Sequence, residues 1–225
     1  MDAGVAGKTA PPVQSGEPGK GARTRERLLD LAYEAMIVKG LGATSVDELV
    51  EAAGITKSGF FYHFRDKNDL ARQVVARYRT ANDAQLDALS RRARELSEEP
   101  LQSFLIFLRL YAEAITAEIE AAPGCLVATV AFQERAFAHD VRQANVETVD
   151  GWRTRFRDWL CEAVQSARPN AAVDVELLAD AGWSAIFGAF TLAKTGRPAS
   201  VVASQVLLYR DVVRRAFAEG ISLPS

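Results

Sequence analysis

The stretch GITKSGFFYHFRDKNDL, residues 54–70, decides the fold of this chain. Gly54 can end one apolar helical segment, and Thr56 can cap a short helix over residues 57–63, because its side-chain oxygen accepts a backbone N–H of the first turn. Asp66 offers the same cap to a further helix. Two short helices joined by a glycine-containing turn form a helix-turn-helix, whose second helix enters the major groove of DNA. The stretch therefore predicts a recognition helix over residues 57–63.

The residues before this stretch predict two more helices. Ser45-Val-Asp-Glu48 fits a capping box and starts an apolar-faced helix that runs to about Ala53. A helix over residues 23–39 precedes it and is stopped by Gly40. On the recognition helix, Phe60 and Phe64 are spaced by one turn and are expected to anchor it in the core.

Residues 54–70, with TSVDELVEAAG (residues 44–54) before them, resemble the recognition region of the tetracycline-repressor (TetR) family of bacterial transcription regulators. The resemblance covers residues 23–75. It implies an all-α fold, with a three-helix DNA-binding domain over residues 23–70. Residues 71–225 would then form a helical domain that binds an effector and dimerises.

The resemblance also implies which residues face DNA. Lys57 and Ser58 fall in the first turn of the recognition helix, where side chains reach base edges and phosphates. Phe61 departs from the tyrosine common in the family, so the polar contact that family members often make there is either absent or replaced by an apolar contact with a thymine methyl. Thr44 matches a phosphate contact, with a simple turn role as the alternative. The expected DNA-facing residues are Thr44, Lys57, Ser58, Gly59, Phe61, Tyr62, His63 and Lys67.

Composition excludes several classes of protein. The 225 residues carry 27 Lys and Arg against 29 Asp and Glu, so any affinity for DNA must come from a local basic patch. With 48% hydrophobic residues the chain has enough apolar side chains for a substantial core. Residues 1–22 are rich in Gly and Pro and lack aromatic residues, which predicts a disordered arm. No apolar run approaches about 18 residues and no signal peptide is recognisable, so we expect a cytoplasmic protein without membrane partners.

The second domain contains no nucleophile elbow, phosphate loop or metal-ligand motif, so we expect no enzyme activity, no cofactor and no metal. Its aromatic residues follow helical spacing, which is typical of a core. The resemblance makes some of them candidates for lining an effector pocket. These are Phe104, Phe107, Tyr111, Phe132, Trp152 and Phe156.

Cys125 follows Pro123-Gly124 and is expected in the first turn of the next helix, where exposed N–H groups lower a thiol pKa. That position makes it a candidate sensor of oxidants or electrophiles. The alternative is a small buried hydrophobic residue.

Two helices close the chain, over residues 175–195 and 199–219. By the resemblance, the last two helices of each subunit form a four-helix dimer interface, and a packed intramolecular bundle is the alternative. The expected interface residues are Trp183, Phe187, Phe190, Val206, Tyr209 and Val213.

The sequence thus predicts a homodimeric regulator, a repressor released from a palindromic DNA operator by a small apolar or aromatic effector. Three alternatives remain. The first is a regulator that senses redox state or electrophiles through Cys125, and the second is an architectural DNA-binding protein that needs no ligand. The third is a helical sensor or enzyme that retains a degenerate helix-turn-helix.

Overall fold

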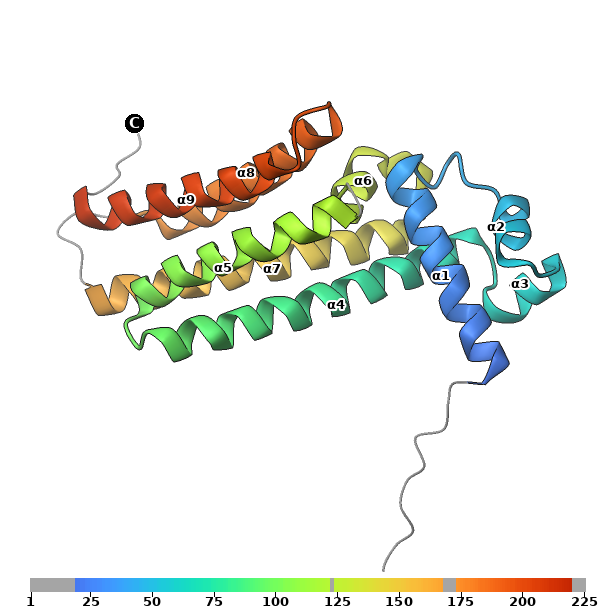
Figure 1. The fold of residues 1–225 in the computed structure, drawn as a ribbon, viewed down its shortest axis with the longest axis horizontal. Helices are drawn as coiled ribbons and strands as arrows, with labels where there is room; N and C mark the ends of the chain where they lie inside the picture. The colour runs from blue at the N-terminus through green and yellow to red at the C-terminus, as the bar shows by residue number, and fades with distance from the viewer. Residues whose placement is uncertain (1–18, 122–123, 168–172, 220–225) are drawn as a thin grey trace, which may run out of the picture.

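The computed structural model describes residues 19–121, 124–167 and 173–219, and the expected N-terminal arm lies almost entirely outside them. The described residues form nine α-helices and one 3-10 turn, without a β-strand, so the predicted all-α fold is confirmed (Figure 1). The helices are α1 (Lys20–Val38), α2 (Val46–Ala53), α3 (Lys57–His63), α4 (Lys67–Leu96), α5 (Pro100–Ala121), α6 (Leu126–Phe132), α7 (His139–Ala167), α8 (Val175–Lys194) and α9 (Ser200–Glu219).

The first three helices enclose one hydrophobic core. Phe60 and Phe64 are buried in it, as the sequence predicts, and so are Leu28 and Met36 of α1. This core does not stop at the third helix, because Leu126 of α6 belongs to it as well. The N-terminal helices are therefore packed directly onto the second domain.

The long helix α4 joins the two parts of the molecule (Figure 1). Asp66 caps it by accepting the backbone N–H of Asp69 at 2.8 Å. From the N-terminal core α4 runs alongside α5 and α7, while α8 and α9 pair with each other and pack on those helices. One helix thus takes part in both cores.

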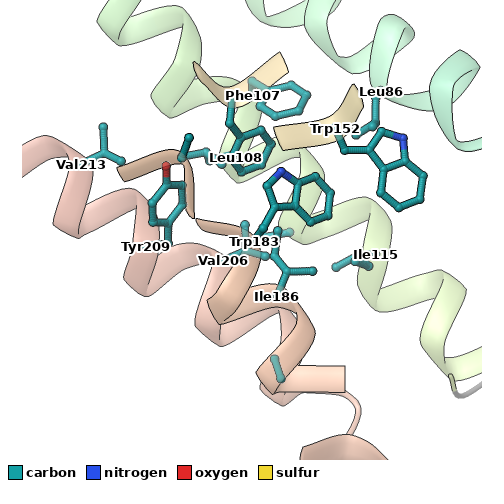
Figure 2. Packing of buried hydrophobic residues seen from close by; sticks show 14 of the residues in the cluster. Leu86, Phe107, Leu108, Ile115, Trp152, Trp183, Ile186, Val206, Tyr209 and Val213 are labelled. Carbon is teal, nitrogen blue, oxygen red and sulfur yellow. The ribbon is translucent and has the colours of Figure 1, made fainter. Parts of the chain in front are cut away.

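The second core contains a cluster of aromatic rings among its aliphatic side chains (Figure 2). Phe107 stacks on Trp159 and meets Phe156 edge-on, with ring centroids about 6 Å apart in both pairs. Gly182 lets α8 approach this cluster, because a Cβ there would lie 2.7 Å from the Tyr209 ring. Close packing therefore fills the space between α5, α7, α8 and α9.

Helix α8 is long and apolar enough to span a membrane when only length and composition are considered. The sequence expectation of no such segment does not hold by this criterion. A third of the apolar window is buried inside the molecule, and α8 packs against α7 and α9.

Candidate DNA-binding site

Local hydrogen bonds fix the geometry of the helix-turn-helix. Ser45 and Glu48 form the predicted capping box at the start of α2, with the Glu48 N–H donating to Ser45 Oγ at 3.1 Å. Gly54 ends α2 with φ of 66°, a left-handed conformation that favours glycine. Thr56 then caps α3 by accepting the Gly59 N–H at 3.2 Å. The helix boundaries predicted around the turn are thus confirmed.

The outer face of α3 is open to solvent. Phe61 is 54% exposed and Tyr62 is 83% exposed, while Phe60 on the inner face is fully buried. Lys57 and Ser58 at the start of the helix are exposed as well. Two large aromatic side chains held in water on a seven-residue helix are unusual for a surface without a partner.

Lys57 is held in an ion pair. Its ammonium lies 2.7 Å from the Asp47 carboxylate on α2, and both side chains are largely exposed. An exposed pair of this kind contributes little to stability, about 0–1 kcal/mol. Lys57 is consequently available to a phosphate or a base edge at the cost of releasing Asp47.

His63 lies where α3 meets the beginning of α1. The His63 Cε1 atom is 3.9 Å from the position of a Cβ on Gly21, and its ring meets Tyr62 edge-on at 5.0 Å. The first turn of α1 therefore lies beside the end of α3.

Thr44 and Lys67 serve the turn between α1 and α2. Thr44 is buried, and its hydroxyl donates to the Gly40 carbonyl oxygen at 2.9 Å. The Lys67 ammonium donates to the carbonyl oxygens of Leu41 and Thr44 at 3.0 and 3.1 Å. The geometry favours the turn role that the sequence left open for Thr44, and it gives Lys67 a structural role that the sequence did not predict.

Two cations outside the predicted DNA-facing set lie close to α3 in sequence or in space. Arg65 follows the C-cap residue Phe64 of the recognition helix, and its side chain is 78% exposed. Lys20 is exposed in the first turn of α1, next to Gly21, which approaches His63. Arg65 was detectable in sequence as a basic residue flanking the recognition helix, whereas the position of Lys20 depends on the packing of α1 against α3.

The predicted effector residues do not surround one cavity. Phe104, Phe107 and Phe156 are fully buried against one another, and Trp152 donates its indole N–H to Asp83 at 2.9 Å. Tyr111 stacks at the edge of this cluster on Phe107. Phe132 departs furthest from the expectation, because it is 74% exposed on α6.

Cys125 differs from its expected chemistry. It precedes α6 as the N-cap residue and is only 6% exposed. Burial raises the pKa of its thiol, although hydrogen bonds from neighbouring N–H groups and the Tyr78 hydroxyl act in the opposite direction. The expectation of a lowered pKa is therefore wrong, and the thiol suits a buried apolar residue better than a reactive sensor.

The predicted dimer residues face inward. Val206, Tyr209 and Val213 of α9 are at most 3% exposed within a single chain, and Trp183 and Phe190 of α8 are also buried. Phe187 is partly buried against the same core. The helix faces available to a partner instead carry the exposed Leu192, Leu207 and Leu208.

A helix-turn-helix with an exposed recognition helix, joined by α4 to an all-helical second domain, defines the class of one-component DNA-binding transcription regulators. Residues 28–74 match the family model of bacterial regulatory proteins of the tetR family. The family model, the curated relatives and the solved structures together support a TetR-family transcriptional regulator.

Similarity to known regulators extends over most of the chain. The transcriptional regulator AcuR of Cereibacter sphaeroides is 28% identical over 75% of each chain. The HTH-type transcriptional repressor KstR2 of Rhodococcus jostii is 29% identical over 78% of this chain and 84% of the relative. The crystal structure of regulatory protein TetR from Rhodobacter sphaeroides, with 26% identity, superposes with a TM-score of 0.67 over 86% of this chain and 98% of that one.

Proposed function

We propose that this protein is a homodimeric, cytoplasmic repressor that binds a two-fold symmetric operator and is released by a small effector. The observation that carries the DNA-binding part is the solvent-exposed face of α3, where Phe61 and Tyr62 stand out beside Lys57. A helix of this kind inserts its first turns into the major groove. Its contacts with phosphate set the position on the duplex, and its contacts with base edges select the sequence.

The proposed DNA contacts fall into groups according to whether each side chain is exposed or already has a structural role in the fold. Lys57, Ser58, Phe61 and Tyr62 are exposed and remain the first candidates, with Gly59 permitting close approach of the duplex. His63, Arg65 and Lys20 extend the surface toward the flanking phosphates. Thr44 and Lys67 act indirectly, because they hold the turn that orients α2 and α3.

Dimerisation is proposed through the outer faces of α8 and α9. Leu192, Leu207 and Leu208 are exposed there, and Gly188 has open space around the position of a Cβ. Small residues and leucines on one face permit two helices to approach closely and bury apolar area. A second copy of the chain related by two-fold symmetry would place the two α3 helices for successive major grooves, roughly 34 Å apart.

Selection of bound fragments tests the proposed function. The purified protein is mixed with random double-stranded DNA at physiological salt, and the retained pieces are sequenced over several rounds. We expect enrichment of one symmetric site. Equal recovery of all sequences would instead support an architectural DNA-binding protein, and absence of any retained DNA would refute the proposal.

A further inference from the structure

A cavity of about 550 Å³ lies where the two domains meet, and we name it the junction cavity. It is lined by Asp30 and Tyr33 of α1, by Ile119 of α5 and by Phe190 of α8. Helix α4 contributes further lining residues, among them the exposed Ala81. Its volume falls within the roughly 300–1,000 Å³ of small-molecule sites.

The lining of the junction cavity is mainly apolar and aromatic, and it also includes the polar side chains of Asn82 and Gln85. Tyr33 and Tyr78 stack with ring centroids 5.9 Å apart and ring planes 26° apart. Burial raises the pKa of Tyr78 above its ordinary value, which already leaves the hydroxyl neutral at physiological pH. A flat ring would find stacking partners on Tyr33 and apolar contacts with Ile119 and Phe190.

The charges at the rim disfavour an anion. The Arg77 guanidinium already donates to the carboxylates of Asp30 at 2.7 Å and Glu26 at 3.1 Å. An anionic ligand would have to compete with these two carboxylates and would be repelled by them. A molecule without negative charge avoids this cost.

We propose that the junction cavity is the effector site and that it takes a flat, mainly apolar molecule without negative charge. This assignment rests on the proposed effector-responsive function. It places the ligand outside the close-packed ring cluster of Phe104, Phe107 and Phe156, which are candidate pocket residues by sequence.

The position of the junction cavity supplies the coupling to DNA binding. Arg77 ties α4 to α1 through its two ion pairs, and the Lys194 ammonium at the end of α8 donates to the Ile37 carbonyl oxygen of α1 at 3.0 Å. A ligand between Tyr33 and Phe190 therefore contacts α1 and α8 at once. Ligand binding favours the position of α1 in which the ligand makes better contacts. The affinity for DNA changes because the position of α1 affects the recognition helix packed beside it.

A matched pair of variants on α4 tests the assignment. Ala81 lines the junction cavity, whereas Ala84, one turn further along, is exposed outside it. The probes are Nile red, which is flat and uncharged, and the anionic dye anilinonaphthalene sulfonate. We expect Nile red to bind wild-type protein and Ala84→Trp alike, and Ala81→Trp at least about tenfold more weakly. The anionic dye should bind at least about tenfold more weakly than Nile red to the wild-type protein.

Equal affinity of Nile red for the two variants would overturn the assignment of the site. If the anionic dye binds the wild-type protein more strongly than Nile red does, and Ala81→Trp abolishes that binding, the proposed ligand class would be overturned. Saturating Nile red should also lower the affinity of the wild-type protein, but not of Ala81→Trp, for the selected DNA. Unchanged wild-type affinity would overturn the coupling. Failure of the chain to retain any DNA is a separate result, which would refute the proposed function itself.

Discussion

The ammonium of Lys67 donates a hydrogen bond to the carbonyl oxygen of Thr44 at 3.1 Å, and so joins the first turn of α4 to the turn between α1 and α2. Lys67 places a positive charge at the N-terminus of α4, where the helix dipole disfavours cations. Its hydrogen bonds to the two carbonyl oxygens offset this electrostatic cost. Its role is to hold α2 and α3 in place rather than to lie free on the surface.

Replacing Lys67 should therefore cost stability. We expect Lys67→Met to lower the free energy of unfolding by about 1–3 kcal/mol, because two charge-assisted hydrogen bonds are lost. The exposed Lys57 is the matched control, and Lys57→Met should change stability by less than about 0.5 kcal/mol. Urea unfolding of both variants measures the difference.

The same two variants should differ in the salt dependence of their affinity for DNA. Lys57→Met should make the salt dependence of DNA affinity shallower by about one unit of slope per protomer if Lys57 contacts a phosphate. Lys67→Met should leave that slope unchanged. A shallower slope for Lys67→Met alone would restore Lys67 as a phosphate contact.

Asp69 should make the fold sensitive to acid. Burial by itself would raise the pKa of this carboxyl, but hydrogen bonds from the Arg65 N–H, Arg72 and Gln73 outweigh it and lower the pKa to about 2. Because the pKa of Asp69 is lower in the folded state than in the unfolded state, the ionised carboxylate stabilises the fold at pH values above the unfolded-state pKa. This stabilisation is lost as the pH falls toward the folded-state pKa. We expect a loss of about 1–2 kcal/mol between roughly pH 5 and pH 2.

The variant Asp69→Asn should lack this part of the pH dependence, while being less stable than the wild type near neutral pH. Thermal unfolding at a series of pH values checks both. Parallel pH profiles for the two proteins would mean that other carboxylates govern the acid transition.

Replacement of two glycines of α8 by alanine should change the stability of the fold in opposite directions. A Cβ at Gly182 would lie 2.7 Å from Tyr209 and 3.0 Å from Phe156, so Gly182→Ala should destabilise the fold by about 1–3 kcal/mol. Gly188 has no neighbour within 4 Å of that position in a single chain, so Gly188→Ala in the monomeric Leu207→Glu background should stabilise the helix by up to about 1 kcal/mol. Urea unfolding at a single protein concentration compares them, and equal effects would contradict the packing described for α8.

The exposed leucines of α9 should control assembly. We expect Leu207→Glu to convert the dimer to a folded monomer, because a carboxylate would be buried at the proposed interface. Leu96 at the end of α4 is about as exposed, so Leu96→Glu is the control and should leave the dimer intact. Sedimentation velocity distinguishes the species, and a Leu207→Glu dimer would place the interface elsewhere.

Local signals explain why the helix-turn-helix was predictable. The cap residues Ser45 and Thr56 and the left-handed Gly54 act within three or four residues of themselves, so their consequences are visible in sequence. The burial of Phe60 and Phe64 follows from their spacing by one turn.

Tertiary contacts explain what was not predictable. Helix α8 carries apolar or small residues around most of its circumference, so its sequence does not show which face is buried within the chain. For this reason Trp183, which the fold buries, was among the residues expected at an interface. Lys67 bonds residues more than twenty positions away, and Tyr33 and Phe190 come together only when α1 docks on the second domain.

The most direct test of the central claim is a hydroxyl-radical footprint of the protein on the DNA that selection enriches. We expect two protected patches on one face of the duplex, related by two-fold symmetry and about one helical turn apart, where each α3 enters a major groove. Tyr62→Ala should weaken both patches equally, since the exposed Tyr62 of each protomer occupies the same place. A single patch, or continuous protection that Tyr62→Ala leaves unchanged, would contradict this claim.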